Sequence, residues 1–448
     1  MRIGLIYPNI GRKGDSLFLD GARMEPLGLA VIAGLTPPDI EITLIDDRVE
    51  EIPYDVSFDL VAISVQIFTA RRSYEIATAF RKRGVPVALG GIHVTLAPEE
   101  AAEHADTIIM GDAELSWPAL IYDLRQKNLQ TRYMCHPAEH PQNGVLPRRD
   151  LFIGKKYLPL TLMQFSRGCK NQCSFCASSV YFQKQHYVRD VAEIRREIQG
   201  QKRKQLFFVD DNIVADKAAA KELFRALIPL KVHWVSQASM DMLDDSELMD
   251  LMVRSGCLGH VIGFESIGAD GVAAMNKSTN ERFIADGYVY AVNELRRYGL
   301  QTWAAFTVGH DTDTIESIRE TCNFAMRNKF TFAAYNILHP YPGTQLYTQL
   351  ESEERLLYNG KWWLHPEYRF NYASFIPKNM TADELTDVAF WCRRTFNSSS
   401  SIIRRAFEPR TNLRSPLRLL AYMAYNPLFR REVFNKQGIT FGYEGETP

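Results

Sequence analysis

Short apolar segments alternate with helix-like segments along the first 126 residues, and this alternation restricts the fold more than any other feature. The segment at residues 60–65 (LVAISV) is almost wholly apolar, as a strand buried on both faces should be. Five such segments predict strands, at residues 2–7, 40–45, 60–65, 85–89 and 107–110. Strands joined by helices form a parallel, doubly wound sheet, which binds ligands beyond the carboxyl ends of its strands. We therefore predict a Rossmann-like domain over residues 1–126.

A second series of the same kind occupies residues 158–345. Its strands are predicted at residues 158–165, 205–209, 232–237, 260–264, 301–308 and 331–338. Six such βα units predict a partial (β/α)6 barrel with its active site at the carboxyl ends of the strands. Residues 127–157, which carry three prolines, are predicted to be a linker. Residues 346–448 are expected to form a mainly helical extension.

Three helix starts are predicted from capping boxes, in which an N-cap side chain and an acidic side chain three residues later satisfy free backbone groups. The pairs are Asp244 with Glu247, Asp313 with Glu316, and Thr381 with Glu384.

Composition limits the classes of function that the chain can have. The 448 residues are 46% hydrophobic and 23% charged, as in globular domains, and a net charge of −1 provides no basic field for nucleic acid. The sequence contains no run of about 18 apolar residues, so it predicts no membrane span.

The tail is more basic than the rest of the chain. Residues 401–440 contain eight arginines or lysines and two glutamates. The plain interpretation is a helix face exposed to solvent. The alternative is a docking surface for an acidic partner or for phosphate.

Three of the seven cysteines lie within eight residues, as Cys169, Cys173 and Cys176, directly after the first predicted strand of the barrel. Thiolates are soft ligands suited to iron–sulfur clusters. Three of them on one loop hold three irons of a [4Fe–4S] cluster and leave the fourth iron for another ligand. Zinc would need a fourth protein ligand, and no Cys or His follows at that spacing. The other cysteines are too scattered for a disulfide framework or an auxiliary cluster: Cys135, Cys257, Cys322 and Cys392.

The C-x3-C-x2-C spacing after a barrel strand resembles the radical S-adenosylmethionine (SAM) superfamily. The doubly wound domain before the barrel is similar to that of the subgroup with a cobalamin (B12)-binding-type domain, and the resemblance covers nearly the whole chain. It implies a [4Fe–4S] cluster that cleaves SAM reductively to methionine and a 5′-deoxyadenosyl radical. That radical would abstract hydrogen from the substrate in a closed cavity.

The resemblance also assigns roles to side chains at the predicted strand ends. Phe175 matches the position near the adenine of SAM, and Glu265 the position that binds the ribose. Gln237 and Val308 follow as further SAM contacts. Asp210 and Asp211 fall where the family places groups near the SAM amino end and the substrate. Any one of Asp210, Asp211 or Glu265 could instead be a helix cap or a surface pair. The predicted catalytic residues are these two aspartates together with His310, His339 and Tyr341. Two histidines there would suit a polar, hydroxylated substrate, although each could be structural.

The rim of the first sheet is expected to hold the nucleotide tail of cobalamin. The matching residues are Ser64, Gln66, Gly90, Gly91, His93 and Gly111. Glycine lets a backbone approach a bulky ligand closely. The Asp-x-His-x-x-Gly loop that supplies a cobalt-binding histidine is missing, which excludes that mode of ligation and leaves cobalamin itself possible. The alternative is a scaffold domain without a corrin.

The first predicted function is cobalamin-dependent methyl transfer to a carbon atom of a polar small molecule, in natural-product or cofactor biosynthesis. The alternative is cobalamin-independent radical dehydration or rearrangement, such as diol dehydration on an aminosugar. A non-catalytic iron–sulfur or corrinoid carrier is the third. The expected partner is a flavodoxin- or ferredoxin-type electron donor or a dedicated reductase. An oxygen-labile cluster predicts the cytoplasm.

Overall fold

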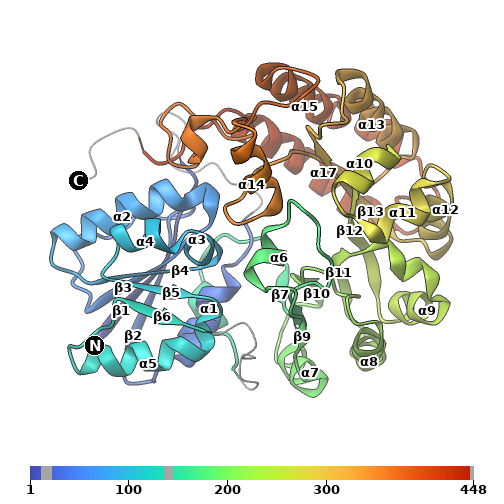
Figure 1. The fold of residues 1–448 in the computed structure, drawn as a ribbon. Helices are drawn as coiled ribbons and strands as arrows, with labels where there is room; N and C mark the ends of the chain where they lie inside the picture. Colours follow the sequence, from blue (N-terminus) through green and yellow to red (C-terminus); the bar gives the residue numbers. More distant parts are fainter. Residues whose placement is uncertain (12–22, 136–144, 444–448) are drawn as a thin grey trace.

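The computed structural model describes residues 1–11, 23–135 and 145–443. Two parallel six-stranded sheets dominate it, each with helices against it (Figure 1). This is the α/β architecture that the alternating segments predict. Within the described ranges, none of the helices is long and apolar enough to cross a membrane.

The N-terminal sheet has the strand order β2-β1-β3-β4-β5-β6, with every neighbouring pair parallel. Its strands are β1 (Arg2–Tyr7), β2 (Glu41–Asp46), β3 (Leu60–Ser64), β4 (Val87–Gly90), β5 (Thr107–Met110) and β6 (Arg132–Met134). The first five match the predicted strands. The sixth lies within 127–157, where the sequence predicts only a linker, and residues 136–144 of that stretch lie outside the described residues. Three residues, two of them exposed, leave too short an apolar pattern to recognise.

Helices cover both faces of this sheet (Figure 1). One face is covered by α1 (Leu27–Leu35) and α5 (Ala113–Arg125), the other by α2 (Ala70–Lys82), α3 (Ile92–Leu96) and α4 (Pro98–Glu103). A short 3-10 helix, η1 (Ile67–Thr69), links β3 to α2, and η2 (Arg149–Phe152) precedes the second sheet. Apolar side chains on both faces of each strand account for the two helix layers.

The second sheet has the strand order β14-β13-β12-β11-β10-β7, and its edge strands β7 and β14 are not paired with each other. It is therefore an open, partial barrel. Its strands are β7 (Thr161–Met163), β10 (Gln205–Phe208), β11 (His233–Ala238), β12 (Cys257–Glu265), β13 (Gln301–Val308) and β14 (Phe332–Ile337). A two-stranded antiparallel ribbon, β8 (Ser166–Arg167) with β9 (Tyr187–Val188), follows β7. The six predicted strands correspond to these six, although β7 is shorter than residues 158–165.

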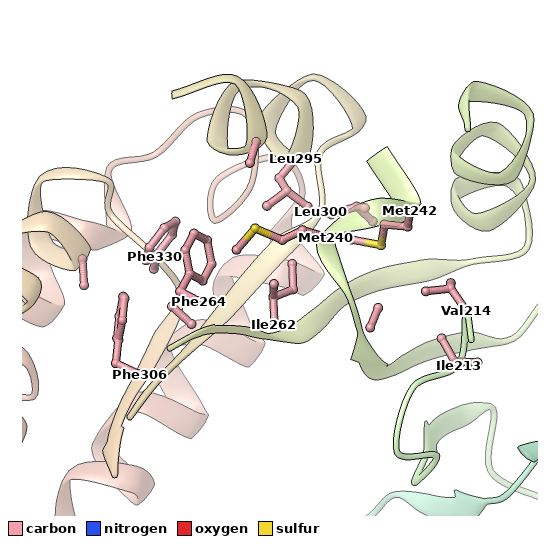
Figure 2. Close-up of a cluster of buried hydrophobic side chains, with 14 of the residues drawn as sticks. Ile213, Val214, Met240, Met242, Ile262, Phe264, Leu295, Leu300, Phe306 and Phe330 are labelled. Atoms are coloured by element: carbon pink, nitrogen blue, oxygen red, sulfur yellow. The ribbon is translucent and has the colours of Figure 1, made fainter. Parts of the chain in front are cut away.

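Side chains alternate between the two faces of each barrel strand. On β12, Ile262 and Phe264 are buried against the outer helices, together with Phe306 of β13 (Figure 2). Val261 and Gly263 lie on the inner face. The outer helices are α6 (Ala177–Tyr181), α7 (Val191–Gln199), α8 (Lys217–Leu227), α9 (Ser246–Arg254), α10 (Ala269–Ala274), α11 (Ser278–Ile284), α12 (Val289–Tyr298) and α13 (Ile315–Arg327), with η3 (Ile228–Leu230) and η4 (Met240–Asp244) between them.

The C-terminal extension packs on both halves of the molecule. It contains α14 (Gln345–Ser352), η5 (Tyr358–Gly360), α15 (Ala382–Phe396), α16 (Ser399–Ala406) and α17 (Pro416–Lys436). α15 packs against α13 and β14. Trp362, Trp363 and Tyr368 join the apolar core of the N-terminal sheet. Phe429 of α17 lies with its ring centroid 4.8 Å from that of Trp303 and 5.0 Å from that of Phe332, so α17 closes the amino-terminal end of the barrel.

The three predicted capping boxes have different outcomes. The Thr381–Glu384 box is present. The other two predictions are wrong by one residue, because Asp245 caps α9 and Thr314 caps α13. Asp313 instead accepts hydrogen bonds from the backbone of Gly309 and His310.

Candidate active site

The loop that carries Cys169, Cys173 and Cys176 begins at the carboxyl end of β7 and is fixed by backbone hydrogen bonds. Gly168 has a φ of 80°, and a Cβ there would lie 2.1 Å from the carbonyl oxygen of Gln185, so only glycine fits. On the far side, Ser174 donates to the carbonyl of Met275 at 3.1 Å. The loop is thus held between β9 and the segment after α10.

Asp210 and Asp211, after β10, both accept hydrogen bonds from the start of this loop. Asp210 accepts from the backbone of Phe165 and from the hydroxyl of Ser166 at 2.6 Å. Asp211 accepts from the backbone of Gly168 at 3.0 Å and from Ser178 at 2.6 Å. Burial raises the pKa of Asp210 to about 6, although these hydrogen bonds oppose the shift.

The three thiols are close enough to influence one another electrostatically. Burial raises the pKa of Cys169, and it raises that of Cys173 to about 11, with Cys176 contributing in each case. Within the described parts of the chain, no group of three or more His, Cys, Asp or Glu side chains is arranged to hold a single metal ion. A [4Fe–4S] cluster differs from such a site, because each thiolate would bind a different iron.

Lys277 is a cation close enough to the thiols to oppose the rise in the pKa of Cys169 and Cys173. Burial alone would lower the pKa of Lys277, but Glu265 and then Cys173 raise it above its usual value. Its ammonium group lies 2.9 Å from the carboxylate of Glu265. The other oxygen of Glu265 accepts a hydrogen bond from Thr307 at 2.7 Å. Glu265 can be identified from the sequence, whereas Lys277 and Thr307 cannot, because neither belongs to a recognisable motif.

The remaining SAM-site candidates are Phe175 in the cysteine loop, Gln237 near the end of β11 and Val308 at the end of β13. Phe175 is partly buried against the barrel core. Gln237 is exposed on β11, and strand alternation places it on the same face as Val235. Val308 is 2% exposed and lies at the end of β13. His310 is 4% exposed, and its ring lies 3.0 Å from the carbonyl oxygen of Thr307, so its Nε2 has a partner within the protein.

His339 and Tyr341 lie between the barrel and the N-terminal sheet. The ring of His339 stacks on Trp362 at 5.1 Å and meets the edge of Phe68 at 5.5 Å. Its Nδ1 is buried without a hydrogen-bond partner, and burial lowers its pKa to about 3. Burial raises the pKa of Tyr341 to about 12, with a smaller contribution from Cys176, so Tyr341 is near the cysteine loop.

The candidate residues at the rim of the N-terminal sheet differ in exposure and in their contacts. Gln66 is exposed, and its amide donates to the hydroxyl of Tyr7 at 3.2 Å. Ser64 is half-buried and pairs with Gly90 in the sheet. A Cβ on Gly90 would make an ordinary contact of 3.6 Å with Ile109. The rim thus presents polar groups beside an accessible backbone, which suits the amide-rich periphery of cobalamin.

The other three rim candidates serve the domain itself. Gly91 and Gly111 have φ values of 104° and 75°. A Cβ on either would lie 2.8 Å from a backbone oxygen of the chain, so the turns themselves require glycine. His93 is fully buried and lies 3.1 Å from Glu100. Its Nε2 is thereby held within the protein.

The rim and the cysteine loop are joined directly by Asp112, the residue after Gly111. Asp112 lies 3.1 Å from the guanidinium of Arg167, which precedes the cysteine loop. It also accepts hydrogen bonds from Tyr181 at 3.2 Å and from Tyr187. Arg167 further pairs with Glu114 of α5. The two candidate cofactor sites are therefore neighbours.

Comparison with known proteins agrees with this arrangement. Residues 163–325 match the radical SAM superfamily, and residues 20–121 match the B12-binding domain. The bacteriochlorophyllide d C-8(2)-methyltransferase of Chlorobaculum tepidum is 31% identical over 352 residues, covering 73% of this chain and 77% of that protein. The C-12(1)-methyltransferase of the same organism is 28% identical over 404 residues, covering 87% and 86%.

A solved structure shares the fold over nearly the whole chain. The cobalamin-dependent SAM radical enzyme OxsB, with aqua-cobalamin and SAM bound, superposes with a TM-score of 0.66 at 13% identity, covering 97% of this chain and 72% of that one. The two matched domains imply a [4Fe–4S] cluster, SAM and cobalamin as cofactors. The chain belongs to the radical SAM superfamily, in the group whose radical SAM domain is preceded by a B12-binding domain.

Proposed function

We propose that this enzyme transfers a methyl group to a carbon atom of a small molecule and depends on cobalamin for that step. The observation that carries the proposal is the link through Asp112, which places the B12-type rim beside the cysteine loop. When bound, the cluster and SAM supply one-electron chemistry and cobalamin carries the methyl group. Relatives named as bacteriochlorophyllide methyltransferases support the same reaction.

The chain's own residues have the following proposed roles. Cys169, Cys173 and Cys176 bind the cluster. Asp210 and Asp211 are positioning residues, because their carboxylates hold the backbone before the cysteines. The groups proposed to surround SAM are Phe175, Gln237, Glu265 and Val308.

The substrate is proposed to lie between the two domains, against His339 and Tyr341. The unpaired Nδ1 of His339 offers a hydrogen-bonding group among aromatic rings that exclude water. A buried nitrogen without a hydrogen-bond partner costs folding free energy. A hydroxyl or carbonyl group of the substrate would supply that partner. His310, whose ring already meets Thr307, is proposed to shape the end of β13.

We further propose that residues 1–126 form the B12-type domain, with β6 of the stretch 127–157 completing its sheet, that residues 158–345 form the barrel, and that residues 346–448 form the extension. Ser64, Gln66 and Gly90 would meet the cobalamin tail, while Gly91, His93 and Gly111 shape that rim from within. Reducing power would come from a flavodoxin- or ferredoxin-type protein in the cytoplasm.

The reaction can be tested with protein reconstituted anaerobically with iron, sulfide and cobalamin, using a chemical reductant and bacteriochlorophyllide d as the probe substrate. We expect both S-adenosylhomocysteine and 5′-deoxyadenosine, with the former dependent on cobalamin. Cys173→Ala should abolish both products, whereas Cys257→Ala, a buried cysteine elsewhere in the barrel, should retain them. Formation of 5′-deoxyadenosine alone, without any need for cobalamin, would contradict methyl transfer and favour dehydration or rearrangement.

A further inference from the structure

The helix α17 has two apolar sides, only one of which is covered by the protein. Its inner side closes the barrel, with Tyr422 fully buried and Phe429 against Trp303. Its outer side carries exposed apolar residues: Leu417 is 47% exposed, Leu420 69% and Met423 49%. The spacing of three residues places them along one stripe of the helix. An exposed apolar stripe of this kind is more typical of an interaction surface than of a helix face that only meets solvent.

The segment that contains this stripe has exposed basic residues and no exposed acidic residues. Residues 397–443 contain two glutamates, Glu408 and Glu432, and both are buried. Glu408 accepts from Thr411, and Glu432 pairs with Lys436 at 3.0 Å. The exposed charges of this segment are therefore all positive: Arg404, Arg410, Arg414 and Arg431.

A surface pocket of about 590 Å³ lies where the loop before α17 meets α12. Four arginines and one glutamate line it, and the glutamate is already paired. Glu294 lies 2.6 Å from Arg297 on the same helix. Arg414 is held in place by a 2.7 Å hydrogen bond to the carbonyl of Tyr298. The remaining charge favours an anionic group such as phosphate.

We propose that this surface, the α17 face, binds a membrane surface that contains anionic phospholipid. The α17 face is defined by Arg410, Leu413, Arg414, Leu417, Leu420 and Met423. Its leucines and methionine enter the boundary between headgroups and acyl chains, while its arginines bind lipid phosphates. The helix lies on the bilayer and does not cross it. The sequence suggested a docking surface for an acidic partner or phosphate in this tail, and the exposed apolar stripe points to lipid.

The sequence pattern alone misjudges which of the basic residues are available. Arg405 is fully buried and donates to the carbonyl oxygens of Phe330 and Thr331. Arg418 is 8% exposed and donates to the carbonyl of Gly299. These two arginines hold the extension against the barrel. Arg410 and Arg414, in the loop before α17, are exposed and are the basic residues proposed to meet the membrane.

The proposal can be tested by vesicle flotation of the full-length protein, independently of catalysis and of any cofactor. Vesicles of phosphatidylcholine are compared with vesicles that also contain phosphatidylglycerol. We expect binding to the anionic vesicles only, and weaker binding as salt is raised. The double variant Leu420→Glu/Met423→Glu should lose binding by about tenfold or more, and Arg410→Glu by about fivefold.

The matched control is Tyr122→Glu, which changes another exposed apolar residue, 65% exposed, on α5. It should bind like the wild type. Unchanged circular dichroism and melting temperature establish that the variants are folded. The proposal is overturned if the wild type does not float with anionic vesicles, or if the double variant binds as well as the control. It is likewise overturned if light scattering shows dimers that the double variant disrupts while vesicles do not bind, because the stripe would then join two copies of the chain.

Discussion

Glu265 adopts a left-handed backbone conformation, with a φ of 60°, at the end of β12. A non-glycine residue pays about 1 kcal/mol for this conformation, and such strain is concentrated at functional sites. Here the conformation turns both carboxylate oxygens to partners, Lys277 on one side and Thr307 on the other. The strained backbone thus places a charged pair next to the cysteine loop.

The histidines show how far single residues can be interpreted from sequence. His93, His310 and His339 all follow predicted strands. The alternation of apolar and helix-like segments indicates where those strands end. The partners that the structure gives them are Glu100 for His93, the carbonyl oxygen of Thr307 for His310 and the aromatic ring of Trp362 for His339. No spacing pattern connects these pairs, so their roles could only come from the folded chain.

A fourth histidine provides a pH-dependent prediction. His260, 2% exposed, lies 2.9 Å from Ser236 and 3.0 Å from the sulfur of Met252, and burial lowers its pKa to about 3. The folded state keeps this ring neutral, whereas the unfolded state takes up a proton below its ordinary pKa of 6.5. The contribution of the neutral ring to the free energy of unfolding is therefore complete above that pKa and is lost as the pH falls below it. Between about pH 7.5 and about pH 5.5 the loss is about 1.4 kcal/mol.

Denaturant unfolding at the two pH values measures this loss. His260→Phe should lose about 1.4 kcal/mol less unfolding free energy on acidification than the wild type. His233→Phe, which replaces an exposed histidine of β11, should lose as much as the wild type. An equal loss in His260→Phe would mean that His260 is not kept neutral by the fold.

At the scale of elements, the alternation of apolar and amphipathic segments predicts all six barrel strands and five of the six N-terminal strands. Their pairing follows from parallel connectivity. The N-caps are harder, because several Asp, Ser and Thr side chains compete at each helix start. Asp244 pairs with Arg282 at 2.6 Å, which leaves Asp245 to cap α9. Such competition is decided by tertiary contacts.

The extension provides an element-scale prediction. Arg405 joins α16 to the start of β14 and to the end of α15, through carbonyl oxygens including those of Phe330 and Phe396. Arg405→Met leaves these buried oxygens without a donor and should cost about 3 kcal/mol of unfolding free energy. Arg404→Met, at the exposed neighbouring position, should cost less than about 0.5 kcal/mol. Chemical denaturation compares the two, and equal losses would mean that Arg405 is not an anchor.

At the scale of the whole molecule, the extension connects the two halves. Glu100 of α4 accepts a hydrogen bond from Trp363 at 2.9 Å and pairs with Lys361 at 3.2 Å. Trp362, beside Trp363, stacks on His339 of the barrel end. The order of the two domains can be predicted from sequence. Their relative placement depends on contacts between residues of different segments, such as Asp112 with Arg167 and Glu100 with Trp363, for which the sequence holds no local signal.

The central claim is that the three cysteines after β7 bind an iron–sulfur cluster on three sides. The most direct test is anaerobic reconstitution with iron and sulfide, followed by visible absorption and iron analysis of the purified protein. We predict a brown wild-type protein with bound iron and sulfide, loss of both in Cys173→Ala, and retention in Cys257→Ala. A wild-type protein that stays colourless and free of iron under these conditions would contradict the account.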